Sequence, residues 1–138
     1  MAHTEIKNTL KEPATPISIA AWLSVSNGQE AASFYQSALG ATIVYKLEAP
    51  DGTLVVARLA IGISEFWVGA ASPEETPGAG PVPVRMILTV PDPDTLFAQA
   101  LKAGASEIFP VGEEHGWRLG RIADPFGHHW EIGHPVAG

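Results

Sequence analysis

The sequence predicts an α+β fold made of two βαβββ modules within one compact domain. Segments with strand-like and helix-like apolar patterns follow one another in the same order in both halves of the chain. A stretch rich in glycine and proline, residues 72–81, separates the halves and is interpreted as a linker. Residues 1–16 show no periodicity and are expected to form an N-terminal arm. With 138 residues, 46% of them apolar, the chain is long enough and apolar enough to bury a hydrophobic core.

The first module is assigned to residues 17–71 and begins with an apolar strand over 17–25. A helix is expected next, because Asn27 and Glu30 have the spacing of a capping box. Gly40 ends the helical repeat of apolar residues. Three strands then complete the module, at residues 41–49, 53–61 and 64–71, with a turn at 50–52.

The second module is assigned to residues 82–135 and repeats this order. A strand over 82–90 precedes a helix, which Asp92 caps, Pro93 starts and Gly104 ends. Three strands follow at residues 105–111, 117–123 and 128–134, and the last two are joined by a turn at 124–127.

The two halves also match residue by residue, which supports a duplicated architecture. Residues 23–27 correspond to residues 88–92, which lie 65 positions later. Gly62 corresponds to Gly127 at the same offset. Order, offsets and helix caps agree, so we predict two equivalent modules.

Composition excludes several functional classes. The chain has no cysteine, so disulfides, thiolate nucleophiles and cysteine metal sites are excluded. Its net charge of −7, with no basic cluster, argues against nucleic acid as a partner. No apolar run approaches the length of a membrane span, and the polar N-terminus lacks the apolar centre of a signal peptide. We therefore expect a cytoplasmic protein without membrane or nucleic-acid partners.

Two motifs give the sequence a family resemblance. FYQSALGA closes the first predicted helix and DPFGHHWEI, residues 124–132, lies in the last hairpin. With the paired modules, these motifs resemble the vicinal oxygen chelate superfamily, which includes glyoxalases, bleomycin-resistance proteins and dioxygenases, and most of all its PhnB-like branch. The resemblance implies a curved mixed sheet around a ligand trough and a homodimer, often with modules paired across chains.

The resemblance also implies four metal-ligand positions on the trough floor. They fall on Ala20, Phe66, Arg85 and Glu131. Alanine and phenylalanine cannot bind a metal and arginine is cationic, which leaves one carboxylate where about three ligands are needed. We therefore expect no metal or other cofactor. A non-standard divalent metal site that uses His129, Glu131 and the loop residue His115 is an alternative.

Other residues are expected to contact a ligand in the trough. Arg85 and Glu131 should face each other, either as a simple ion pair or with Arg85 bound to an anionic group. Glu131 is a candidate catalytic base, although an arginine partner favours its charged form. Strand alternation places Trp22, Phe66 and His129 toward the trough. Trp67 and Trp130 are expected in the core. Arg118 and Arg121 are expected on the outer hairpin, where Arg118 should reach the trough rim.

These residues favour metal-independent binding of a small, partly aromatic or anionic molecule in the troughs of a dimer. One alternative is a divergent enzyme, a lyase, isomerase or dioxygenase, that uses a non-standard metal or Glu131 as base. Another is an interaction subunit whose trough has lost its function.

Overall fold

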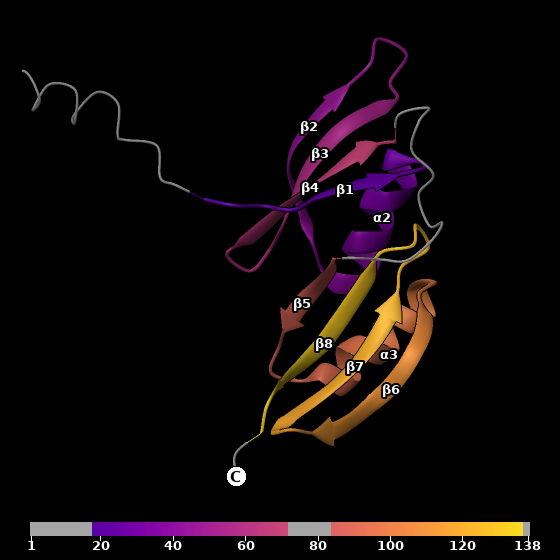
Figure 1. The fold of residues 1–138 in the computed structure, drawn as a ribbon. Helices are drawn as coiled ribbons and strands as arrows, with labels where there is room; N and C mark the ends of the chain where they lie inside the picture. Colours follow the sequence, from indigo (N-terminus) through magenta and orange to yellow (C-terminus); the bar gives the residue numbers. More distant parts are fainter. Residues whose placement is uncertain (1–17, 72–83, 137–138) are drawn as a thin grey trace, which may run out of the picture.

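The structure is a computed structural model that describes residues 18–71 and 84–136. The predicted arm, 1–16, and linker, 72–81, lie outside the described residues. The described residues form two four-stranded sheets, each with one helix (Figure 1). The first half contains β1 (Trp22–Val25), α2 (Gly28–Leu39), β2 (Thr42–Glu48), β3 (Leu54–Ile61) and β4 (Ser64–Ala70). The second half contains β5 (Arg85–Thr89), α3 (Pro93–Ala103), β6 (Ser106–Glu114), β7 (Trp117–Ala123) and β8 (His129–Pro135).

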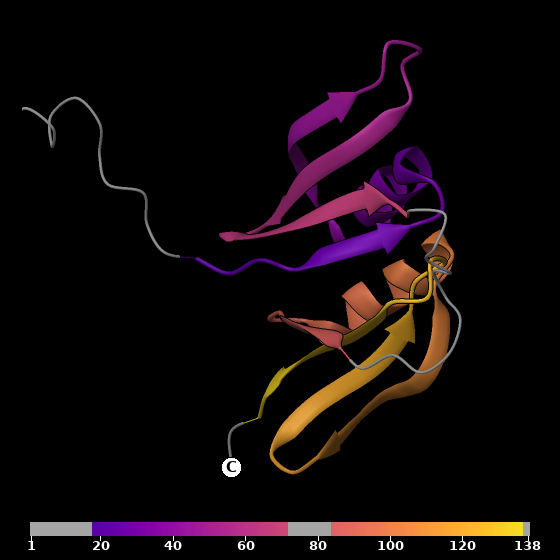
Figure 2. The ribbon, with the colours of Figure 1, turned by 45° about the horizontal axis from the view of Figure 1, so that its top comes forward.

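Both sheets have the same topology, which confirms the predicted α+β fold class. Their strand orders are β1-β4-β3-β2 and β5-β8-β7-β6. In each sheet the first strand pairs in parallel with the last strand, and the other pairings are antiparallel. The two sheets lie as separate layers in Figure 2. No helix in the described segments is long and apolar enough to cross a membrane.

The predicted helix caps are present at both helices. The Asn27 side chain accepts a hydrogen bond from the Glu30 amide at 3.0 Å, and Asp92 accepts one from the Thr95 amide at 3.2 Å. Gly40 closes α2 with a φ of 72°, in the left-handed region that favours glycine. These local signals fix the limits of both helices.

Only the strand over 117–123 has the predicted limits at both ends, and two of the other differences affect candidate site residues. The first strand begins at Trp22 rather than at residue 17, so Ala20 precedes β1. The strand predicted over 105–111 continues to Glu114. This strand, β6, lies at the edge of its sheet, where the missing N–H of Pro110 can face away from the neighbouring strand without breaking the pairing. His115 consequently lies in a short turn, with a φ of 53°, and not in a longer loop.

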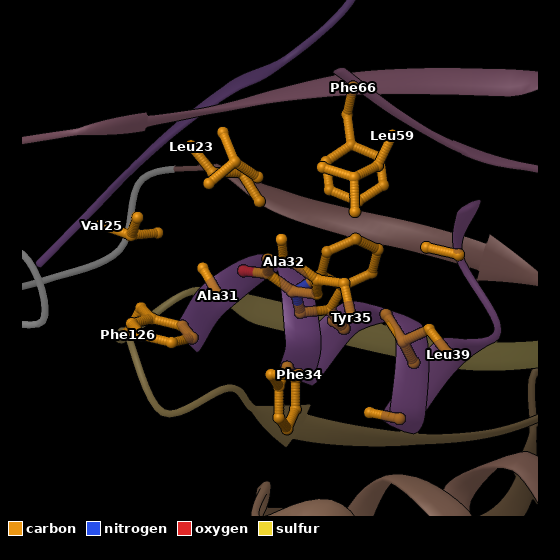
Figure 3. Close-up of a cluster of buried hydrophobic side chains, with 14 of the residues drawn as sticks. Leu23, Val25, Ala31, Ala32, Phe34, Tyr35, Leu39, Leu59, Phe66 and Phe126 are labelled. Carbon is orange, nitrogen blue, oxygen red and sulfur yellow. The ribbon is translucent and has the colours of Figure 1, made fainter. Parts of the chain in front are cut away.

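One hydrophobic core joins the two modules (Figure 3). Tyr35 on α2 lies between the sheets, with its ring 5.4 Å from Phe66 of β4 and 5.5 Å from Trp130 of β8. Phe66 and Trp130 also touch directly, at 5.4 Å between ring centroids. Each sheet therefore contributes its helix-covered face to the shared core. The opposite face of each sheet, called here its open face, is turned away from that core.

A buried carboxylate connects the two modules through hydrogen bonds. Asp124 occupies the predicted β7–β8 turn, where its Oδ1 accepts the amides of Phe126 and His128 at 3.0 and 2.9 Å. Its Oδ2 accepts the Trp130 indole N–H at 2.9 Å and the Tyr35 hydroxyl. Burial, with the nearby Asp124 charge, raises the pKa of Tyr35 far above its ordinary value. Four donors thus satisfy one buried anion, and one of them comes from the other module.

Candidate functional site

Strand register defines which residues of the two open faces are equivalent. Across the first sheet, Trp22 pairs with Trp67, Trp67 with Arg58, and Arg58 with Tyr45. This row of four residues is called the first-module rung. Across the second sheet, the corresponding row consists of Ile87, Glu131, Arg121 and Phe109, the second-module rung. Each sheet therefore carries an arginine beside an aromatic residue at the same place on its open face.

This register corrects the predicted orientation of Phe66. The residue equivalent to Glu131 is Trp67, because each pairs with the first strand and the arginine of its own sheet. Phe66 is 3% exposed and lies in the core, whereas Trp67 lies on the open face beside Trp22. The prediction that Phe66 faces the trough and Trp67 the helix was wrong.

The error has a physical cause in the turns. β3 and β4 are joined by the two residues Gly62 and Ile63, whereas five residues, 124–128, join β7 and β8. The two turn glycines are therefore not equivalent, and alignment on them shifts the last strand by one position. Since strand side chains alternate, a shift of one residue exchanges the two faces.

The second-module rung holds a cluster of charges around Glu131. Arg85 donates from Nε to Glu131 Oε2 at 3.0 Å, and Arg121 donates from Nη2 to the same oxygen at 3.1 Å. The Glu131 side chain is 15% exposed, while that of Arg85 is 49% exposed. The predicted contact between Arg85 and Glu131 is confirmed. Two guanidinium groups share one carboxylate, so the cluster carries a net positive charge.

Arg121 is the member of this cluster that the sequence prediction placed elsewhere. Its guanidinium lies 5.1 Å from the centroid of the Phe109 ring, within the range of a cation–π contact. Its Nε is buried without a hydrogen-bond partner among the described residues. Successive side chains of a strand point to opposite faces, and Ile122 is buried in the core. Its neighbour Arg121 therefore lies on the open face with Glu131, and this alternation could have been read from the sequence.

A small apolar pocket of about 130 Å³ adjoins this cluster. Glu131 lies at its polar side, and the remaining lining is largely hydrophobic: Ile87, Leu88, Trp117, Leu119 and Gly133. His129 lies two residues before Glu131 on β8 and pairs with Arg85 in register, which agrees with the predicted shared face. The open face of the second sheet therefore combines cations, one anion and an apolar hollow.

Arg118 does not reach this site. It lies one residue from Leu119 on β7 and points to the helix side, where Nε and Nη2 bind the two carboxylate oxygens of Asp94 on α3 at 2.7 and 2.6 Å. The paired guanidinium holds the pKa of Asp94 below its usual value. The predicted place of Arg118 at the trough rim was wrong, because alternation along β7 gives the open face to Arg121 instead.

The first-module rung is aromatic. The rings of Trp22 and Trp67 lie 6.4 Å apart and nearly parallel, at 19°. Tyr45 meets the edge of Trp67 at 6.0 Å, and the Arg58 guanidinium lies 5.2 Å over the Trp67 ring. Trp22 is 52% exposed, so this side of the sheet presents a large accessible ring. Ala20 is exposed just before β1.

The residues at the metal positions implied by the fold do not fit a divalent metal. With the corrected register these positions are Ala20, Trp67, Arg85 and Glu131, which offer one carboxylate and no second ligand. Among residues 18–71 and 84–136, no group of three or more histidine and acidic side chains is placed to hold a metal.

The alternative metal ligand His115 is not near His129 and Glu131 along the sheet. It belongs to the β6–β7 turn, beside the pair formed by Trp117 and Pro135, four residues along β8 from Glu131.

The fold and the two open faces define a protein of paired βαβββ modules. The chain belongs to the glyoxalase-like domain family, whose sequence profile matches residues 20–133. An uncharacterised protein of Mycobacterium tuberculosis, Rv0887c, is 34% identical over 143 residues, which cover 98% of this chain and 84% of that protein.

Solved structures share the fold. TioX from Micromonospora sp. ML1 has a TM-score of 0.71 at 23% identity and covers 88% of this chain and 100% of its own. A Bacillus cereus protein described as PhnB, a putative 3-demethylubiquinone-9 3-methyltransferase, has a TM-score of 0.64 at 20% identity, with 88% and 100% covered. These identities show the fold, and they support the resemblance to the PhnB-like branch at that level.

Proposed function

We propose that this protein binds a small anionic molecule, partly aromatic, on the open face of its second module and without a metal. The observation that carries the proposal is the sharing of one Glu131 oxygen by Arg85 and Arg121. Two guanidinium groups have more donors than one carboxylate oxygen can accept, so an incoming carboxylate or phosphonate can take the remaining ones.

The two arginines have different parts in this proposal. Arg85 is half exposed and can turn toward a ligand, whereas Arg121 is held between Glu131 and the ring of Phe109. Because Arg121 is already held in place, little further side-chain ordering is needed when an anion binds. The adjoining pocket of about 130 Å³ is large enough for a compact apolar group.

We further propose that the working form is a homodimer. Within one chain the two open faces point away from the shared core, because Phe66 and Trp130 meet on the helix side of their sheets. A ligand enclosed between a first-module face and a second-module face therefore needs a second chain. Such a trough would set the aromatic rung of one copy opposite the charged rung of the other.

Glu131 has a binding role in this proposal and not a catalytic one. Arg85 and Arg121 both donate hydrogen bonds to Glu131 Oε2, so this oxygen already has two donors. Glu131 holds the two arginines in place, and an incoming anion must compete with it for their N–H groups.

The test uses phenylphosphonate and benzoate as probes in isothermal titration calorimetry. Arg85→Ala should weaken binding by about 1.5–3 kcal/mol, roughly 10- to 150-fold, because a charge-assisted contact is lost. Arg118→Ala is the matched control, since it removes the same charge from the opposite face and should leave affinity unchanged. Equal affinities for the two variants would contradict the proposed site.

The metal-free part of the proposal is tested separately on protein treated with a chelator. Affinity for phenylphosphonate should be the same before and after treatment. If treatment abolishes binding and a divalent metal restores it, the metal-independent proposal is refuted and the non-standard metal site is favoured.

A further inference from the structure

A cavity of about 500 Å³, called here the intermodule cavity, lies at the boundary between the two modules. The β3–β4 hairpin of the first module forms one wall and β5 of the second module forms the other (Figure 1). Phe66 and Trp130 of the shared core line its inner end. Met86 also lines it, and strand alternation puts this residue on the opposite face of β5 from Arg85. The cavity therefore lies on the core side of the sheets and not on their open faces.

The internal repeat explains why this boundary is hollow. At the equivalent boundary, the five-residue turn between β7 and β8 packs against β1. There the His128 ring donates from Nε2 to the Ser24 carbonyl at 2.9 Å, and Phe126 is buried. The turn between β3 and β4 has only two residues, Gly62 and Ile63, and the side chain of Ile63 is fully exposed. The shorter turn buries no side chain beside β5, which leaves the cavity.

The wall formed by β5 also offers backbone hydrogen-bonding groups. Thr89 is the equivalent of Ser24, whose carbonyl is bound at the other boundary. The Val90 N–H donates to the Gly133 carbonyl of β8 at 3.0 Å. Backbone groups of successive strand residues point to alternate sides, so those of Ile87 and Thr89 point away from β8. Because β5 is the outermost strand of its sheet, no strand in the described part of the chain pairs with this edge.

The lining of the intermodule cavity favours an uncharged occupant. Most of the residues around it are hydrophobic: Ile61, Phe66, Met86, Leu88, Val90 and Trp130. Among the described residues that line it, Glu65 is the one with a charge, and it forms an ion pair with Arg58 at 3.4 Å. A ligand anion would therefore meet a carboxylate and no lining cation. The volume is within the range of small-molecule sites, which are mostly apolar with a few polar groups.

We propose that the intermodule cavity binds a compact, uncharged and mainly apolar molecule that carries one hydroxyl or carbonyl group. Its apolar part contacts Phe66, Trp130 and Met86, where burial of apolar surface drives binding. Its polar group bonds to the free backbone edge of β5 at Ile87 or Thr89. The cavity reaches core residues, so its occupant enters between the modules, which favours a small molecule over the surface of a second chain. The site takes no anion and is therefore distinct from the function proposed above.

The test is a titration of the full-length protein with 1-adamantanol, followed by NMR of methyl and indole signals. The chain has two methionines and four tryptophans, so Met86→Leu and Trp117→Phe assign the signals of these two residues. The methyl signals of Met86 and Ile63 should shift, because both residues line the cavity. The indole signal of Trp117 should not, because Trp117 lines only the smaller pocket of the second module.

A matched probe and a matched variant test the chemistry and the place of binding. The anion 1-adamantanecarboxylate should bind roughly tenfold more weakly or less, because burial of an unpaired charge is costly. Ser64 lines the cavity on the same face of β4 as Phe66, so Ser64→Trp should fill it and weaken 1-adamantanol roughly tenfold or more. Ser106→Trp is the control, since Ser106 also begins a strand and is exposed but does not line the cavity.

Four results would overturn the proposal. One is the absence of Met86 and Ile63 shifts up to the solubility limit of 1-adamantanol, and another is a shift confined to Trp117. Equal binding of the carboxylate would refute the preference for an uncharged ligand. Signals that change with protein concentration and not with the probe would show that a second copy of this chain occupies the cavity. The shifts and the probe preference are measured on the parent protein, so they test the proposal even where Ser64→Trp does not fold.

Discussion

Replacement of Tyr35 by phenylalanine tests the connection between the modules. The Tyr35 hydroxyl is buried and donates to Asp124 Oδ2, so the substitution removes one hydrogen bond to a carboxylate. Hydrogen bonds to charged groups contribute about 1.5–3 kcal/mol. Since the amides of Phe126 and His128 and the indole of Trp130 still donate to Asp124, we expect a loss of about 2 kcal/mol.

The assay is urea unfolding followed by circular dichroism, with the slope of the free energy against urea concentration unchanged. Tyr45→Phe is the matched control, because Tyr45 is exposed on the open face and its hydroxyl is not part of this network. The control should remain within about 0.5 kcal/mol of the parent protein. A Tyr35→Phe variant as stable as the control would refute the proposed role of the hydroxyl.

The same variant should change how stability depends on pH. Burial raises the pKa of Tyr35 in the folded protein, so the unfolded chain ionises this residue near pH 10 while the folded chain keeps its proton. The contribution of Tyr35 is therefore complete below about pH 10 and falls above it, by about 1.4 kcal/mol per pH unit. The stability gap between parent and Tyr35→Phe should narrow between about pH 9 and about pH 11. A constant gap would contradict the raised pKa.

Two further predictions test the corrected orientations. Phe66→Ala should cost about 3–5 kcal/mol in urea unfolding because it empties a core position, whereas Trp22→Ala should cost about 1 kcal/mol or less; the reverse order would restore Phe66 to the open face. Arg118→Ala should raise the pKa of Asp94 toward its ordinary value in a ¹³C NMR titration, because the bidentate guanidinium is removed; an unchanged pKa would show that Arg118 does not bind Asp94.

Local signals in the sequence were sufficient for the elements of this fold. Asn27 and Asp92 cap the two helices as predicted, because a cap depends only on a side chain and an amide three residues later. The same order of elements in both halves then predicted the two modules. In each module the first and last strands pair in parallel, and parallel strands need a crossover connection, which here contains the helix. The contact between Arg85 and Glu131 was also predictable, because it joins neighbouring strands of one module.

It was harder to predict which face of its sheet each strand side chain points to, and the lengths of the turns explain part of the difficulty. Phe66 and Trp67 were exchanged because the turn before β4 is shorter than the one before β8, a difference that a repeat anchored on glycine conceals. Arg118 was expected at the trough rim and Arg121 on the outer hairpin, because the prediction did not apply strand alternation to these two arginines, which lie three residues apart. Strand pairing settles this, since Arg121 pairs with Glu131 in register and Arg118 does not.

The sequence by itself determined the secondary structure, the duplication and the shortage of metal ligands, because each depends on residue types and short-range spacing. Only the tertiary structure decided which side chains share a surface. It placed Tyr35 and Trp130 around the Asp124 carboxylate from opposite modules. It also placed Trp22 over Gly69 and Arg58 over the Trp67 ring on one open face. Such groupings depend on strand register and on how two sheets pack around one core, and these are properties of the whole chain.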